Sequence, residues 1–96
     1  MKAKLMMNLR QPVSENAFAA IKIWQVPQPV RASLHTLKYS LALVRNGVCL
    51  LRYDNEAGKG DHKHIGQDEI NYEFQDAAKL LDDFWADVDM ILKEQI

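Results

Sequence analysis

Apolar and polar residues alternate along the first part of the chain, which is the pattern of strands with one buried face. The alternation runs through residues 3–9 and resumes over residues 17–26. Gln11-Pro12 and the polar residues after it predict a connection of several residues between two strands that form a hairpin. Pro27-Gln28-Pro29 ends the second strand, because proline lacks the N–H that a sheet ladder requires. Residues 27–35 are therefore expected to form a surface loop.

The next segment predicts a second hairpin with a defined register. Residues 36–45 and 48–54 flank Asn46-Gly47, the residue pair that a two-residue type I′ turn prefers. So short a loop fixes which residues of the two strands face each other. On one face of the hairpin it predicts the pairs Arg45–Val48, Leu43–Leu50, Leu41–Arg52 and Tyr39–Asp54.

This hairpin is apolar near its turn and polar at its open end. Tyr39, Arg52 and Asp54 are expected to meet at the open end. Cys49 is expected opposite Val44 as a small buried residue of the core.

The C-terminal part of the chain changes its period. Residues 70–74 predict a short last strand, and apolar residues then recur at spacings of three and four from about Asp76 to Lys93. This spacing predicts an amphipathic helix whose acidic side is solvated. The apolar stripe comprises Ala77, Leu81, Phe84, Val88 and Ile91, widened by Ala78, Trp85 and Leu92.

Strands followed by a helix indicate an α+β fold. We expect one domain over residues 1–96, with a small antiparallel sheet of four to five strands and the C-terminal amphipathic helix packed on one face. The length and the apolar content of 48% suit one modest core. We see no apolar run of transmembrane length and no signal-peptide pattern, and the single cysteine excludes an internal disulfide. A cytoplasmic protein without a membrane partner is expected.

The net charge of −1 hides an asymmetry along the chain. Residues 1–66 carry ten Lys or Arg against four acids, whereas residues 67–96 carry two Lys against nine acids. A basic body suits a phosphate-bearing partner such as RNA.

Titratable residues gather between residues 52 and 64. Two of the three histidines, His62 and His64, lie there, whereas His35 stands apart and is expected at the surface. If residues 61–65 are extended, His62 and His64 point the same way and Lys63 points the opposite way. A cluster of this kind in a short domain indicates a functional face, although a solvated charged loop has the same composition.

Two chemistries suit His62, His64 and Asp54. Two imidazoles can act as general base and general acid when RNA is cleaved through its own 2′-hydroxyl, because the pKa of histidine lies near neutrality. This reaction needs no cofactor. Alternatively, the same three residues can bind a divalent metal. A third interpretation is structural: the histidines form hydrogen bonds with the loop backbone and fix its shape. Asp54 or Asp61 can orient an imidazole.

Several neighbours of the histidines are candidate substrate-binding residues. Arg52, Lys59 and Lys63 can hold phosphate. Tyr53 can stack on a base, and Tyr39 is expected beside Asp54.

A family resemblance rests on these residues. Arg52-Tyr53-Asp54-Asn55, followed by Gly58-Lys59-Gly60-Asp61-His62-Lys63-His64-Ile65, resembles the TumE family of small bacterial and archaeal toxins. The likeness extends through Asp83-Phe84-Trp85-Ala86-Asp87-Val88, and more weakly to Trp24-Gln25-Val26-Pro27 and Tyr39. It covers essentially the whole chain.

The resemblance implies the toxin half of a type II toxin–antitoxin pair, whose cognate antitoxin carries a helix-turn-helix DNA-binding domain. The resemblance supplies no catalytic residue. The endoribonuclease hypothesis therefore comes from the chemistry of His62, His64 and Asp54 and from the general observation that many small toxins attack RNA. The alternatives are a metal-dependent nuclease and a non-catalytic binding or regulatory module. The oligomeric state stays open.

Overall fold

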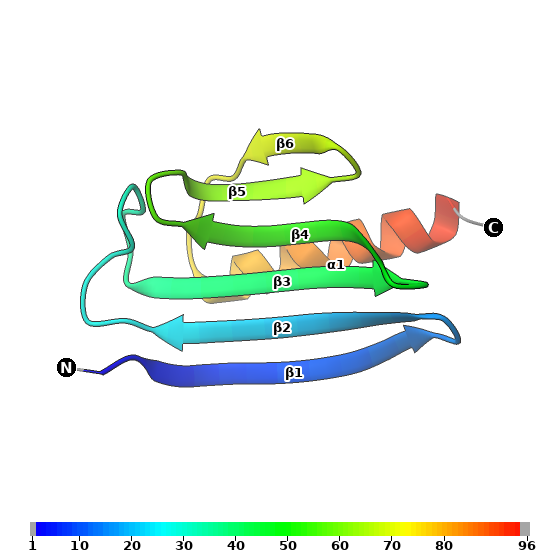
Figure 1. The fold of residues 1–96 in the computed structure, drawn as a ribbon, viewed down its shortest axis with the longest axis horizontal. Helices are drawn as coiled ribbons and strands as arrows, with labels where there is room; N and C mark the ends of the chain where they lie inside the picture. The colour runs from blue at the N-terminus through cyan, green and yellow to red at the C-terminus, as the bar shows by residue number, and fades with distance from the viewer. Residues whose placement is uncertain (1, 95–96) are drawn as a thin grey trace.

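The structure, a computed structural model, describes residues 2–94. It contains one antiparallel sheet and one helix (Figure 1). The strands are β1 (Lys4–Ser14), β2 (Ala17–Gln25), β3 (Leu37–Arg45), β4 (Val48–Glu56), β5 (Gly60–Ile65) and β6 (Asp68–Asn71), and the helix is α1 (Ala77–Glu94). This confirms the α+β fold with a C-terminal helix.

The sheet is a meander in which each strand pairs with the next along the chain, in the order β1 to β6. It has six strands rather than the four to five expected. The difference lies after β4, where β5 and β6 form a further hairpin. The last strand, β6, occupies Asp68–Asn71 and so begins before the predicted segment 70–74.

The first hairpin is tighter than predicted. β1 continues through Pro12 to Ser14, and only Glu15-Asn16 connects it to β2. Proline is tolerated here because β1 is an edge strand, where one side of the backbone has no ladder partner. The prediction of a connection of several residues was therefore wrong.

The second hairpin confirms the predicted turn and corrects the predicted register. Asn46 and Gly47 both have positive φ, at 51° and 77°, as a type I′ turn requires. Arg45 pairs with Val48 and Val44 with Cys49, but the pairing then slips by one residue at a β-bulge. Beyond the bulge the pairs are Leu43–Leu51, Leu41–Tyr53, Ala42–Arg52 and Ser40–Asp54.

The bulge decides which residues of β4 enter the core. An extra residue in one strand moves every later side chain to the other face. Leu51 and Tyr53 thereby join Leu41 and Leu43 in the core, each at most 1% exposed. The predicted pairs Leu43–Leu50, Leu41–Arg52 and Tyr39–Asp54 were wrong for this reason.

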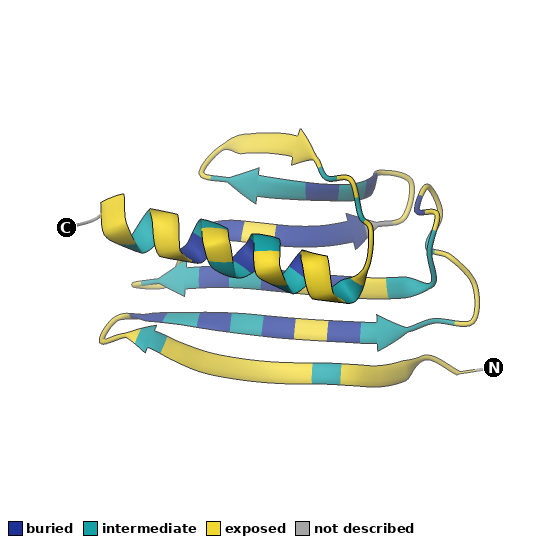
Figure 2. Cartoon of the chain, turned by 180° about the vertical axis from the view of Figure 1, so that it is seen from behind, coloured by how far each residue is buried: buried dark blue, intermediate teal, exposed yellow. Residues whose placement is uncertain are grey.

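The helix packs on one face of the sheet, near its middle (Figures 1 and 2). Its buried residues are Leu80, Phe84 and Val88, so the centre of the apolar stripe includes Leu80, which the predicted stripe omitted, while Ala78 is exposed. Asp76 caps the first turn, accepting a hydrogen bond from the Lys79 N–H at 2.8 Å.

The helix leaves β1 uncovered, and most residues of that strand are exposed (Figure 2). Within residues 2–94, no helix is long and apolar enough to cross a membrane.

Candidate functional site

The two faces of the sheet separate the predicted site residues. We define the open face as the face opposite α1. The strand pairing places Arg52, Asp54, His62 and His64 on the open face, because Arg52 pairs with His64 and Asp54 with His62. His62 and His64 therefore point the same way, as predicted.

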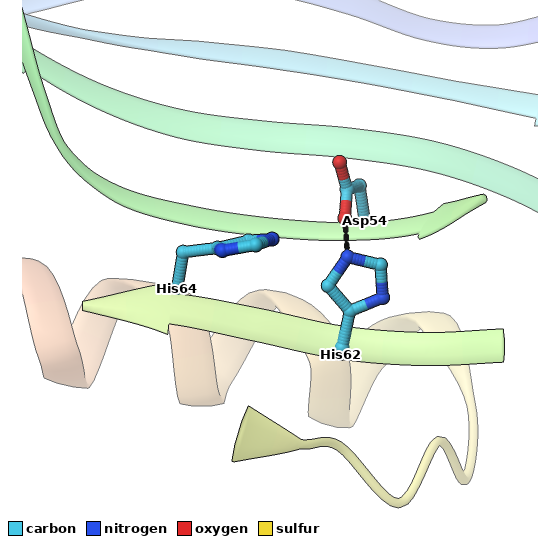
Figure 3. A group of neighbouring side chains, drawn as sticks. All are labelled: Asp54, His62 and His64. Carbon is cyan, nitrogen blue, oxygen red and sulfur yellow. Dashed lines mark ion pairs between the residues drawn. The ribbon is translucent and has the colours of Figure 1, made fainter. Parts of the chain in front are cut away.

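Asp54, His62 and His64 form a compact trio on β4 and β5 (Figure 3). His62 Nε2 lies 2.8 Å from Asp54 Oδ1, and His62 Nδ1 lies 3.0 Å from the Gly60 carbonyl oxygen. The ring of His64 stands edge-on to the ring of His62, with 4.8 Å between centroids. Although the trio is on the open face, His62 is only 1% exposed.

The protonation of His62 follows from these contacts. The Gly60 carbonyl can only accept, so His62 Nδ1 carries a proton and donates it. Nε2 then has two states: it is protonated in an imidazolium paired with Asp54, or it offers a lone pair. Within residues 2–94 Nε2 has no aligned hydrogen-bond partner despite its contact with Asp54. Glu69 Oε1 lies 3.7 Å from the same nitrogen.

The trio has the donor set of a cation site. One ligand atom from each of Asp54, His62 and His64 lies within 4.8 Å of the others. Two imidazoles and a carboxylate are common ligands of divalent transition metals. The bond from His62 Nδ1 to a backbone carbonyl is the kind of contact that orients a metal-binding imidazole.

Arg52 extends the trio along the open face. It is exposed and pairs across the strands with His64, which is half-buried. Together with Cys49 and Gly66, these two residues line a shallow pocket of about 210 Å³. Cys49 is exposed there, so the prediction of a buried cysteine was wrong. A guanidinium beside the trio is suitably placed to contact a phosphate.

Tyr53 and Lys63 lie on the opposite face of the sheet, beneath α1. The Tyr53 hydroxyl donates a hydrogen bond to Asp87 of the helix, and Lys63 Nζ lies 3.2 Å from Asp87 Oδ2. Burial, the hydrogen bond to Asp87 and the charge of that carboxylate raise the pKa of Tyr53 well above its usual value. The structure thus separates these two candidate substrate-binding residues from the histidines and places them in the contact between helix and sheet.

Tyr39 is also on the face beneath α1, in a cluster that the sequence did not reveal. Asp61 accepts hydrogen bonds from the Tyr39 hydroxyl at 2.7 Å and from Ser33 Oγ at 2.7 Å. His35 Nε2 lies 2.6 Å from Asp61 Oδ2. Asp61 does orient an imidazole, but it is that of His35. Tyr39 is therefore not beside Asp54, contrary to prediction.

The backbone fixes the tautomer of His35. Leu37 N–H donates to His35 Nδ1 at 3.1 Å, so the proton of the ring is on Nε2 and points at Asp61. The ring also stacks on Phe74, with 3.7 Å between centroids. The expectation of a surface histidine was wrong, and the spacing of His35 and Asp61 in the sequence gives no signal of this contact.

Lys59 lies in the turn between β4 and β5, outside the trio. It is exposed at one wall of a cleft of about 310 Å³. The cleft is also lined by Ala32, Leu34, His35, Gly60, Asp61, Asn71, Tyr72, Glu73 and Phe74. Of the predicted substrate-binding residues, only Arg52 shares the open face with the histidines.

The family of the chain follows from comparison with known proteins. The sequence model described as Toxin TumE matches residues 3–92. The chain belongs to the TumE toxin family. No curated protein and no solved structure gives a significant match.

In this TumE toxin, one segment that carries the family resemblance forms the trio, and two such segments meet beneath the helix. Residues 52–65 supply the trio on the open face and Lys63 beneath the helix. Residues 83–88 supply Asp87, the helix partner of Lys63. They also supply Asp83, which accepts a hydrogen bond from the Tyr72 hydroxyl at 2.6 Å. Membership of the family indicates a toxin that an antitoxin neutralises.

Proposed function

We propose that this TumE toxin cleaves RNA with the help of a divalent cation held by Asp54, His62 and His64. The observation that carries the proposal is the environment of His62. Its side chain is 2% exposed, its Nδ1 is bonded to the Gly60 carbonyl, and its Nε2 faces Asp54 and Glu69.

This environment favours the metal-dependent alternative over a pair of acid–base histidines. A general base or acid must come within hydrogen-bond reach of the proton that it transfers. His64 is half-buried and can be reached by a substrate, whereas His62 is enclosed by the side chains around it. A buried imidazole with one oriented nitrogen suits a ligand better than a proton carrier.

A cation at this place would serve phosphodiester cleavage in two ways. It would lower the pKa of the attacking oxygen, and it would neutralise charge that develops on the phosphate. Arg52, exposed beside His64, would bind the same phosphate. The excess of Lys and Arg over acids in residues 1–66, which include Arg52 and the trio, supports RNA as the substrate.

The decisive experiment follows metal binding and RNA cleavage by the same protein. Apoprotein prepared with a chelator should bind Mn²⁺ or Zn²⁺ in calorimetry. His64→Ala and Asp54→Asn should weaken this binding by about 10-fold or more and abolish toxicity and RNA cleavage. Lys93→Ala, on the exposed end of the helix, is the matched control and should leave all three readouts unchanged.

Two outcomes would overturn the proposal. Cleavage that persists in excess chelator, with no binding of either cation, would return the site to metal-independent chemistry. Growth inhibition that survives in the His62→Ala/His64→Ala double variant would support a non-catalytic binding module.

The partner proposed for this toxin is a helix-turn-helix antitoxin. The support is membership of a toxin family, which implies a neutralising protein in general. Co-expression with the product of the adjacent reading frame should yield a complex that survives purification. Separate elution of the two proteins would contradict this proposal.

A further inference from the structure

The open face carries a set of cations that the site described above does not use. Arg10, Lys22 and Lys38 are exposed, and each belongs to a different strand of β1–β3. Among the side chains that the structure describes on this face of β1–β4, the only carboxylate is that of Asp54. This residue is 7% exposed and paired with His62. The outer surface of this part of the sheet is therefore positive.

The strand register places Lys22 and Arg10 in two neighbouring rows that lead to the trio, and Lys38 lies beside them, paired with Trp24. One row crosses the sheet as Asn8, Lys22, Ser40, Asp54 and His62. The neighbouring row crosses it as Arg10, Ala20, Ala42, Arg52 and His64. Strands lie about 4.8 Å apart, so each row runs for roughly 19 Å from β1 to β5. One row thus carries Lys22 on β2, the other carries Arg10 on β1, and each row ends at a histidine on β5.

Small side chains between the cations hollow the surface. Ala20, Ser40 and Ala42 form the floor of a groove of about 390 Å³, with Arg10 and Lys22 along it. The guanidinium of Arg10 stays over this face because it lies on the ring of Phe18, 3.9 Å from the ring centroid. A ligand backbone can approach the sheet closely along this floor.

An aromatic side chain lies beside the groove. Trp24 is partly exposed, pairs across the strands with Lys38, and lines a second hollow of about 230 Å³ with Lys22 and Ser40. Cations that follow a backbone, next to an aromatic ring that can stack on a base, are the features of surfaces that bind single strands. Proteins that read single-stranded RNA often use an exposed sheet in this way.

The opposite side of the molecule has the reverse charge. Asp82 and Asp89 are exposed on α1, and Asp83 and Asp87 are partly exposed there. A polyanion is repelled from the helix side and attracted to the open face. The charge of the two sides therefore selects both the kind of ligand and the face that it binds.

We propose that the open face is a track for single-stranded RNA, in which Arg10, Lys22 and Lys38 hold phosphates and Trp24 stacks on a base. The track leads the strand toward Arg52 and His64. This proposal rests on the proposed action on RNA, and it names the form of RNA that is bound and the surface that binds it.

The test measures RNA binding separately from cleavage. The His64→Ala protein, which should not cleave RNA, is titrated against a fluorescein-labelled 12-nucleotide single-stranded RNA. Fluorescence anisotropy reports the affinity, and the titration is repeated at several salt concentrations. Lys22→Ala and Lys38→Ala, added singly to this background, should weaken binding. Each should also make the slope of log affinity against log salt less negative by about 0.7, the value for one phosphate contact with a single strand.

Trp24→Ala should weaken binding by about 5-fold or more while leaving the salt slope unchanged, because stacking does not release counterions. Trp24→Phe keeps an aromatic face and should recover most of this loss. Lys93→Ala is the matched control on the helix side and should bind like the parent. The two lysines are exposed, so their loss leaves the core intact; circular dichroism checks the fold of Trp24→Ala.

The possible outcomes separate this proposal from the proposed cleavage. Affinity that depends on Lys22, Lys38 and Trp24, without any cleavage by the wild type, supports the track and rejects the nuclease. Cleavage by the wild type, with RNA affinity unchanged in all three variants, rejects the track alone. Loss of antitoxin binding in these variants, with RNA affinity intact, would make the open face an antitoxin-docking surface and overturn the proposal.

Discussion

All three tyrosine hydroxyls of the chain donate hydrogen bonds to carboxylates. Tyr39 is bonded to Asp61, Tyr53 to Asp87 and Tyr72 to Asp83. Burial is the largest cause that raises the pKa of each phenol, and the hydrogen bond and charge of the carboxylate raise it further. An ionised phenolate next to a carboxylate would be strongly unfavourable in each place.

These three contacts predict a loss of stability at alkaline pH. The pKa of each phenol is higher in the folded protein than its unfolded value of 10.0, so the unfolded chain loses the proton first. Their contribution is complete below about pH 10 and is lost as the pH rises above it. Thermal unfolding between pH 8 and 11 should show a falling midpoint, and Tyr53→Phe should make the fall shallower. Parallel curves for the variant and the wild type would contradict this account.

Asp83 should act in the opposite pH range. The hydrogen bond from Tyr72 is the main cause that lowers the pKa of Asp83, with further support from Lys79. A lowered pKa contributes stability above the unfolded value of 3.8, and this contribution is lost as the pH falls through the folded value.

At the scale of elements, Gly60, the first residue of β5, lies against the loop before β3. Its φ is +74°, and a Cβ at this position would lie 2.9 Å from the Ala32 carbonyl oxygen. The Gly60 carbonyl also accepts the bond from His62 Nδ1. One residue thus sets the approach of two loops and the orientation of a site histidine.

Gly66 provides a matched control for Gly60. Its φ is +60°, but a Cβ there would meet nothing within 4 Å. Gly66→Ala should lower the free energy of unfolding by roughly 1–2 kcal/mol, from backbone strain alone. Gly60→Ala should lower it by a further 1–3 kcal/mol or so, because the Cβ also clashes with backbone. Urea denaturation measures the free energy of unfolding of both variants. Equal decreases would show that the Ala32 carbonyl moves away from the added Cβ at no energetic cost.

At the scale of the whole molecule, helix and sheet share one core. Leu80 and Phe84 are fully buried against the apolar face of the sheet, in a cluster with Leu41, Leu43, Leu51 and Tyr53. Because neither layer has a second apolar layer to pack on, the two should fold and unfold together.

Leu80→Ala should therefore reduce the stability of the entire domain, by about 2–5 kcal/mol. That is a large part of the roughly 5–15 kcal/mol typical of a domain. Leu81→Ala, at a half-buried neighbour, should have a smaller effect. Near- and far-ultraviolet circular dichroism should follow one transition in both variants. Equal losses at the two positions would place the helix in a different rotation about its axis.

Local patterns in the sequence were sufficient for much of this protein. Asn46-Gly47 determined its turn because few residue pairs accept positive φ at both positions. The alternation of side chains along a strand determined that His62 and His64 share a face. The helix was likewise predictable from the spacing of its apolar residues, and the α+β class and the membership of the TumE family from the order of patterns and motifs along the chain.

The tertiary structure alone decided which residues accompany those histidines. A bulge of one residue in β4 placed Tyr53 beneath the helix and Asp54 opposite Ser40, and no local pattern marks it. The contact of Asp61 with His35 joins residues 26 positions apart, and that of Lys63 with Asp87 joins residues 24 apart. Such contacts depend on how the strands pair and where the helix packs. The free energy gained by burying Leu51 and Tyr53 against α1 determines the strand pairing and the position of the helix. It is gained only once the whole domain has formed.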